Sequence, residues 1–283
     1  MKKIAIITDT DSSLPDDLSV QYGIRQVPIN LHINNETFET GIDINDQILF
    51  EKLENIKKYP TTSAPSPEVF AKVFREAIDK GAQTVICICV SSKVSATYNS
   101  AVLASRMIQH DIVVIDSLNL SMGQGFMAIA AAESVLKGAT KDEVLNNIDG
   151  VGKRLHTFAV LPSLKYIAMS GRLNKYSANI GDFLEIKPIL TVQDGKLELI
   201  SRQRTSKKAM DKMLEFVLNV SNGKTIEQCA IIHSNCPEKV PELQKRIKSI
   251  LPDTMPFISS EFTPGLSIHT GPGTIGVTLL TGD

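Results

Sequence analysis

The chain has 283 residues, and its 30 Lys and Arg side chains nearly balance 31 Asp and Glu side chains, which leaves a net charge of −1. This balance argues against a nucleic-acid-binding protein, which usually carries a basic excess. No apolar run approaches the ~18 residues of a membrane span, and the apolar run at the N-terminus is too short for a signal peptide, so we expect a cytoplasmic protein without a membrane span.

Strands and helices alternate through the first half of the sequence. Apolar runs predict strands at residues 3–7, 24–33, 85–90 and 112–115. Apolar residues at helical spacing, together with capping residues, predict helices at residues 13–23, 45–57, 66–81, 98–110 and 124–137. This alternation predicts a mostly parallel sheet with helices on both faces.

The second half of the sequence has a different pattern. Asp194-Gly195 lies between two strand-like runs and predicts a hairpin, hence a mixed sheet. Strands are predicted at residues 158–160, 187–192, 196–202, 230–233, 257–262 and 274–280, and helices at 162–169, 206–220 and 237–250. We therefore expect an α/β fold of two domains that meet at a break at Gly150-Val151-Gly152. The first, residues 1–150, is a three-layer α/β/α domain with a mostly parallel sheet, and the second, residues 151–283, is a two-layer α/β domain with a mixed sheet.

Hydroxyl side chains are frequent where the strands of the first domain end. In a parallel sheet, ligands bind beyond the carboxyl ends of the strands, and hydroxyls beside helix N-termini suit an anionic head group. Each Ser or Thr could instead simply cap its helix. The hydroxyl residues that we consider as candidates are Thr62, Ser63, Ser92, Ser95, Ser117 and Ser121.

Other motifs give little support to catalysis or metal binding. Gly271 to Gly276 spell GxGxxG, but too few residues follow for a dinucleotide-binding unit, and the GxGxxA at Gly123 lies too far beyond its strand. The four cysteines have no metal-ligand spacing and are expected to be buried and reduced. His269 is predicted to lie in a Gly-rich loop, where contact with a ligand and a structural role are equally plausible.

Seven segments, taken in order, resemble the DegV family of bacterial fatty-acid-binding proteins over nearly the whole chain. The family's usual Gly, Leu and first Gly of GGR are replaced by Ala96, Val94 and Ser170, and the extra methyl group of Ala96 could narrow the head-group site. The segments are Ile6-Ile7-Thr8-Asp9-Thr10-Asp11-Ser12, Thr62-Ser63-Ala64-Pro65-Ser66, the stretch from Ser91 to Ala101, Asp116-Ser117 with Ser121 and Gly123-Gln124-Gly125, Tyr166 to Leu173, Lys187-Pro188-Ile189-Leu190, and His269 to Gly273.

The resemblance implies a long-chain fatty acid, such as palmitate, bound between the two domains. Thr62 and Ser95 would hold its carboxylate, and Arg172 would serve phosphate transfer or partner docking, although a surface ion pair is the alternative. The protein would be a carrier without catalytic residues, cofactor or metal, presenting the acid to an ATP-binding fatty acid kinase subunit. An alternative is a phosphotransferase or hydrolase that uses the hydroxyl-rich cleft. The resemblance places six residues close to the carboxylate, namely Ser63, Ser92, Ser117, Ser121, His269 and Gly271.

Overall fold

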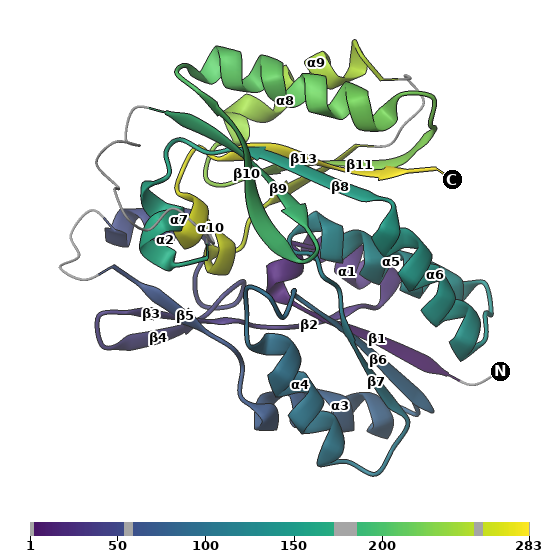
Figure 1. Ribbon diagram of the computed structural model, residues 1–283. Helices are drawn as coiled ribbons and strands as arrows, with labels where there is room; N and C mark the ends of the chain where they lie inside the picture. The colour runs from purple at the N-terminus through teal and green to yellow at the C-terminus, as the bar shows by residue number, and fades with distance from the viewer. Residues whose placement is uncertain (1–2, 54–58, 173–185, 252–256, 283) are drawn as a thin grey trace.

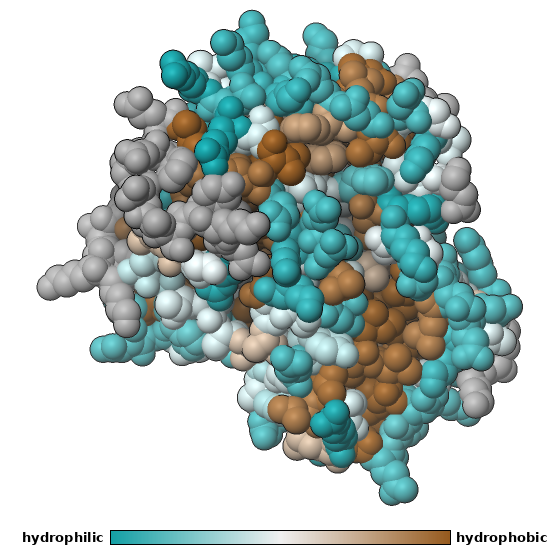
Figure 2. Space-filling model, in the orientation of Figure 1, coloured by the Kyte–Doolittle hydropathy of each residue, from teal (hydrophilic) through white to brown (hydrophobic). Residues whose placement is uncertain are grey.

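A four-stranded parallel sheet forms the centre of the N-terminal half in the computed structural model, which describes residues 3–53, 59–172, 186–251 and 257–282 (Figure 1). Every residue of its inner strand β6 is buried, as the continuous apolar run predicted. Its edge strand β7 is only half-buried, and Figure 2 shows apolar side chains exposed where this edge lies. In spatial order the strands are β2 (Arg25–Val27), β1 (Ile4–Asp9), β6 (Thr84–Cys89) and β7 (Ile112–Asp116).

Helices cover both faces of this sheet. Phe70 and Phe74 of α3 pack with Cys87 and Cys89 on one face. Phe126 of α5 packs on the other face, in a cluster that includes residues of both halves of the chain. The prediction of a three-layer unit with a mostly parallel sheet is therefore confirmed. The helices are α3 (Pro67–Asp79) and α4 (Thr97–Arg106) on the first face, and α1 (Asp16–Tyr22), α5 (Met122–Leu136) and α6 (Lys141–Lys153) on the second.

A six-stranded mixed sheet forms the C-terminal half. Asp194 and Gly195 both have positive φ, as a tight hairpin turn requires, and they join β9 to β10 as predicted. Helices α8 (Ser206–Ser221) and α9 (Val240–Lys248) cover one face, and the other face packs on α5, so α5 lies between the two sheets (Figure 1). In spatial order the strands are β10 (Lys196–Gln203), β9 (Lys187–Gln193), β8 (Leu155–Val160), β13 (Ile275–Thr281), β11 (Ile226–His233) and β12 (Phe257–Glu261).

A small antiparallel sheet, absent from the sequence prediction, lies beside the parallel sheet. The run at residues 24–33 is not one strand, because Pro28 cannot donate a ladder hydrogen bond and the chain leaves β2 there. The second part of the run forms β3, which pairs with β5 so that Leu31 lies opposite Thr62. This sheet thus fixes the position of Thr62. Its strands are β4 (Glu36–Glu39), β3 (Asn30–Ile33) and β5 (Thr61–Ser63).

Two helices occupy segments in which the sequence analysis expected none. The predicted break at Gly150-Val151-Gly152 lies inside α6, which Thr140 and Glu143 start with a capping box. A Cβ on Gly152 would lie 3.3 Å from Met127 Cε, so glycine here allows α6 to approach α5 closely. The second helix is α10 (Pro264–Thr270), which begins with Pro264 at its first turn. The domain boundary near residue 150 stays a prediction.

Four short helical segments complete the described chain. Helix α2 precedes β5, and α7 ends at Gly171, whose φ of 70° provides the left-handed conformation that often terminates a helix. No helix of the described residues is both long enough and apolar enough to cross a bilayer. All four cysteines are buried and free of disulfides, as expected. The four segments are the 3₁₀ turns η1 (Thr10–Ser12) and η3 (Pro237–Lys239), and the helices α2 (Asp46–Leu53) and α7 (Lys165–Ser170).

Asp46 connects α2 to the C-terminal half of the chain through hydrogen bonds. Ser267 of α10 and Ser234 after β11 donate hydrogen bonds to Asp46 Oδ2 at 2.5 and 3.2 Å. The other carboxyl oxygen, Oδ1, is buried and has no hydrogen-bond partner within the described parts of the chain. Burial therefore raises the pKa of Asp46 from 3.8 to about 7.

Replacing Asp46 by Asn is expected to stabilise the protein more at alkaline than at acidic pH. The folded state holds the Asp46 proton more tightly than the unfolded chain, so rising pH lowers the free energy of unfolding until it passes the folded pKa. A shift from 3.8 to about 7 corresponds to about 4 kcal/mol in all, of which about 1.6 kcal/mol is already lost at pH 5, so the expected difference between pH 5 and pH 8 is about 2.7 kcal/mol. Urea unfolding of both proteins at about pH 5 and about pH 8 measures this difference. An equal difference between the two proteins at both pH values would contradict the prediction.

Candidate functional site

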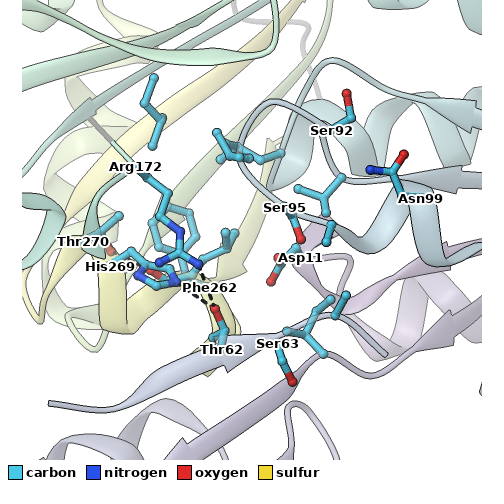
Figure 3. A pocket seen from close by; sticks show the side chains of 18 residues that line it. Asp11, Thr62, Ser63, Ser92, Ser95, Asn99, Arg172, Phe262, His269 and Thr270 are labelled. Carbon is cyan, nitrogen blue, oxygen red and sulfur yellow. Dashed lines mark hydrogen bonds between the residues drawn. The ribbon is translucent and has the colours of Figure 1, made fainter. Parts of the chain in front are cut away.

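A cavity of about 510 Å³ lies beyond the carboxyl ends of β1 and β6, where the two halves of the chain meet (Figure 3). Its volume is in the range of about 300–1,000 Å³ that is usual for small-molecule sites. The loops after β1 and β6, strand β5, the β9–β10 hairpin and helix α10 all contribute to its walls. The position agrees with the expectation that ligands bind beyond the strand ends of a parallel sheet.

One part of the cavity wall is apolar. Val90 and Val94 lie in the loop after β6, whereas Phe262 comes just before α10 and Leu266 lies within it. Leu197 of the hairpin adds a contact from the second sheet. The wall therefore offers a hydrocarbon chain a surface that only the folded protein assembles. Its apolar residues are Ile29, Ala64, Val90, Val94, Ala96, Leu120, Leu197, Phe262 and Leu266.

The polar part of the cavity centres on Thr62. The hydroxyl oxygen of Thr62 lies 3.2 Å from His269 Nε2, and Arg172 Nη2 donates to the same oxygen at 3.5 Å (Figure 3). Arg172 Nη1 also donates to the carbonyl oxygen of Ser170 at 2.6 Å, which orients the guanidinium. The three side chains come from β5, α10 and the residue that follows Gly171. Hydroxyl, imidazole and guanidinium groups together form a site suited to a carboxylate.

His269 is uncharged at neutral pH. Burial, and secondarily the nearby Arg172 guanidinium, lowers the pKa of His269 to about 3. A neutral imidazole can donate one N–H hydrogen bond and accept another. The expectation of a loop was wrong, because His269 lies in α10, where the helix turns its side chain toward Thr62.

Ser95, Ser92 and Ser63 all line the cavity, but their hydroxyl groups differ in role. Ser95 Oγ lies 2.9 Å from Thr97 Oγ1 and accepts a hydrogen bond from the Thr97 backbone N–H, so it both lines the cavity and supports the start of α4. Ser92 is held by its backbone N–H, which donates to Asp116 Oδ1 at 3.0 Å. Ser63 Oγ lies 2.8 Å from Nε2 of His32, and Figure 3 shows it pointing away from the centre of the site.

Three of the residues expected near the carboxylate do not line this cavity. Ser117 closes its own turn, because its hydroxyl donates to the carbonyl oxygen of Asn119. Ser121 acts through its backbone N–H, which donates to the carbonyl oxygen of Asp11 at 2.7 Å. A Cβ on Gly271 would lie 2.3 Å from Tyr166 Cδ2, so glycine is needed at this position to make room for the tyrosine ring.

Asp11 lines the cavity although it was not among the expected site residues. Its side chain is buried, and Oδ1 has no hydrogen-bond partner within the described parts of the chain. Burial and then the neighbouring carboxylate of Asp9 raise the pKa of Asp11, and Arg172 opposes this shift. The sequence signal was present, because Asp11 follows the first strand of a parallel sheet. Asn99 of α4 is a second polar lining residue that the sequence analysis missed.

Metal ligands are not gathered anywhere in the described ranges. Residues 3–53, 59–172, 186–251 and 257–282 contain no group of three or more His, Cys, Asp or Glu side chains that could hold a metal ion. The site as described can orient an anion beside an apolar surface.

Comparison with known proteins links this architecture to one family. The model of the DegV family, described as an uncharacterised protein family, matches residues 3–282. A DegV domain-containing protein of Caldanaerobacter subterraneus is 36% identical over 278 residues, which are 98% of each chain. A fatty-acid-binding DegV family protein of Thermus thermophilus superposes with a TM-score of 0.91 at 30% identity, covering 99% of each chain. The Bacillus subtilis fatty-acid-binding protein DegV superposes with a TM-score of 0.89 at 26% identity, covering 100% of each chain.

Proposed function

Because the chain belongs to the DegV family, we propose that it binds a long-chain fatty acid, such as palmitate, in the cavity between its two halves. The observation that carries the proposal is the joining of an apolar wall to a polar end at Thr62, His269 and Arg172. Solved structures of similar proteins from Thermus thermophilus and Bacillus subtilis are of fatty-acid-binding proteins, which supports the assignment.

The hydrocarbon tail supplies most of the affinity. At ~0.8 kcal/mol for each buried CH₂ group, a sixteen-carbon chain gains on the order of 10 kcal/mol before ordering costs. Each hydrogen bond to the charged carboxylate contributes about 1.5–3 kcal/mol. The polar end therefore fixes the register and orientation of the acid, while the apolar wall determines how tightly it is held.

We further propose that the protein is a cytoplasmic carrier and that a separate ATP-binding kinase subunit phosphorylates the bound acid. The carboxylate would lie against Thr62 and Ser95, with Arg172 beside it to interact with the transferred phosphate or with the partner. A guanidinium suits both tasks, because it stays charged and can make two parallel hydrogen bonds to an oxyanion. In this scheme the protein supplies binding and orientation, and the partner supplies the nucleotide chemistry.

Extraction of the purified protein tests acid binding directly. Organic extraction followed by mass spectrometry is expected to recover one fatty acid per chain, and added palmitate is expected to raise the melting temperature of the stripped protein. A preparation with no acid and no thermal response to palmitate would contradict the proposed function. Phosphoryl transfer or ester hydrolysis by the isolated protein would instead support the enzyme alternative.

Thr62→Val is expected to weaken palmitate binding without unfolding the protein. Valine keeps the shape of threonine and removes only the hydroxyl group, whose loss as a partner of the carboxylate costs about 1.5–3 kcal/mol, or roughly 10- to 150-fold in affinity. Ser95→Ala is expected to act in the same direction and also to lower the stability of α4 by about 1 kcal/mol, because Ser95 supports its start.

Thr61→Val is the matched control for this pair of variants. Thr61 lies on the same strand as Thr62, is exposed and does not line the cavity. Isothermal titration with palmitate and melting curves on all four proteins separate binding from stability. Unchanged affinity in Thr62→Val, whatever its melting temperature, would remove Thr62 from the proposed carboxylate site.

A further inference from the structure

Asp11 places a buried carboxyl group in the wall of the cavity without a hydrogen-bonding partner for one of its oxygens. Asp11 is 7% exposed, and its Oδ1 atom is buried without a hydrogen-bond partner among the described residues. A Cβ added to Gly265 of α10 would lie 2.6 Å from this oxygen, so glycine allows the helix to close over Asp11. An ionised carboxylate that keeps one oxygen buried without a hydrogen-bond donor is costly, so these surroundings favour the protonated form of Asp11, a residue that lines the cavity.

Asp9 and Asp11 form a pair of carboxyl groups in unlike surroundings. Asp9 Oδ2 accepts a hydrogen bond from the Val90 backbone N–H at 2.8 Å, and Asp9 Oδ1 accepts one from the Asp11 backbone N–H at 3.1 Å. Both bonds favour the charged form of Asp9, whereas Asp11 Oδ1 receives none. When two nearby carboxyl groups differ in this way, the one with fewer donors retains its proton to higher pH.

Two titratable groups act on Asp11 through their charge, namely Asp9 at the end of β1 and Arg172 after α7. Burial raises the pKa of Asp9 to about 6, so Asp9 is mostly negative above that pH, and Arg172 is positive. His269 of α10, which lines the same cavity, is neutral. A fatty acid carboxylate held at Thr62 would add a second negative charge to this group. An ionised Asp11 would then repel the ligand, whereas a protonated Asp11 could donate a hydrogen bond to it.

We propose that Asp11 is the proton donor of the head-group site: its carboxyl group and the carboxylate of the bound fatty acid share one proton, so that acid binding is linked to proton uptake. This inference rests on the proposed function and adds a control of the same site by pH. Affinity is highest while Asp11 is protonated in the free protein and falls as pH rises above that range. For one linked proton the fall is at most about tenfold per pH unit.

Titration with sodium decanoate and with decanol from about pH 6 to about pH 9 tests the proposal. The two ligands have the same chain length, but only decanoate carries the carboxylate. Decanoate affinity of the natural protein is expected to fall with pH, and decanol affinity is expected to stay constant. Asp11→Asn keeps the shape of the side chain and a hydrogen-bond donor but cannot ionise. Its affinity for decanoate is therefore expected not to change with pH across this range.

Asp46→Asn is the matched control, since Asp46 has a pKa of about 7 and contacts α10 but does not line the cavity. This variant is expected to keep the pH dependence of the natural protein. Calorimetry of the natural protein in two buffers of different ionisation enthalpy gives a second measure, proton uptake on binding, that does not depend on any variant folding.

The outcomes distinguish this inference from the function on which it rests. The inference is supported if decanoate affinity falls as pH rises and if binding takes up protons. Both effects must be absent in Asp11→Asn. Decanoate binding that is independent of pH and without proton uptake overturns the role of Asp11 and leaves the fatty acid site intact. A pH dependence that persists in Asp11→Asn and disappears in Asp46→Asn also overturns it. Absence of decanoate and palmitate binding at every pH overturns both.

Discussion

Lengthening a saturated acid from ten to sixteen carbons is expected to tighten its binding by about three-thousandfold. Six further CH₂ groups, each contributing about 0.8 kcal/mol when buried, amount to about 5 kcal/mol. The apolar wall formed by Val90, Val94, Leu120, Phe262 and Leu266 is the surface on which this gain depends. Competition against one fluorescent fatty acid, with each ligand kept below its micelle concentration, measures the whole series on a common scale.

The same series in Thr62→Val separates the tail from the head group. Because Thr62 contacts only the polar end of the site, the variant is expected to weaken every acid by a similar factor and to leave the slope per carbon unchanged. A slope near zero in the natural protein would contradict burial of the tail in this cavity. Affinity that rises and then stops rising at one chain length would instead report the length that the cavity accommodates.

Arg172→Ala is expected to abolish acyl-phosphate formation by the cognate kinase subunit, even at saturating fatty acid. An arginine that stabilises charge on a transferring phosphoryl group is commonly worth about 10³- to 10⁵-fold in rate. The structure also places the Arg172 guanidinium beside Thr62, so the variant is expected to weaken acid binding by about 1.5–3 kcal/mol. The family resemblance implied a role for Arg172 in phosphate transfer or partner docking and none in acid binding. This expected loss of affinity adds a role in acid binding.

Acid concentration distinguishes the two roles of Arg172. Thr62→Val serves as the comparison, because its defect lies in binding and excess palmitate is expected to restore its rate of phosphorylation. Rates measured with the partner subunit and ATP over a range of palmitate concentrations give the maximal rate and the half-saturating concentration separately. A maximal rate in Arg172→Ala equal to that of the natural protein would dismiss the transfer role and leave Arg172 as a head-group residue only.

The sequence by itself determined the layers of the fold and the hydroxyl-rich character of the loops that line the cavity. The buried run of β6, the hairpin at Asp194-Gly195 and the alternation of strands with helices each reflect local backbone preference and burial, which neighbouring residues encode. Hydroxyl residues after the strands indicated an anion site at one edge of the sheet, and Thr62 and Ser95 do line a cavity there. The ordered motifs also identified the family correctly.

Only the tertiary structure decided which of these residues act together. Thr62 and His269 meet although 207 residues separate them, and Asp11 joins them because Gly265 lets α10 close over it. Ser117 has the same residue type and the same kind of position after a strand as Ser95, yet its hydroxyl turns back to Asn119. Sequence patterns report local conformation and burial, whereas a site depends on which distant surfaces pack together, and that packing is a property of the whole fold.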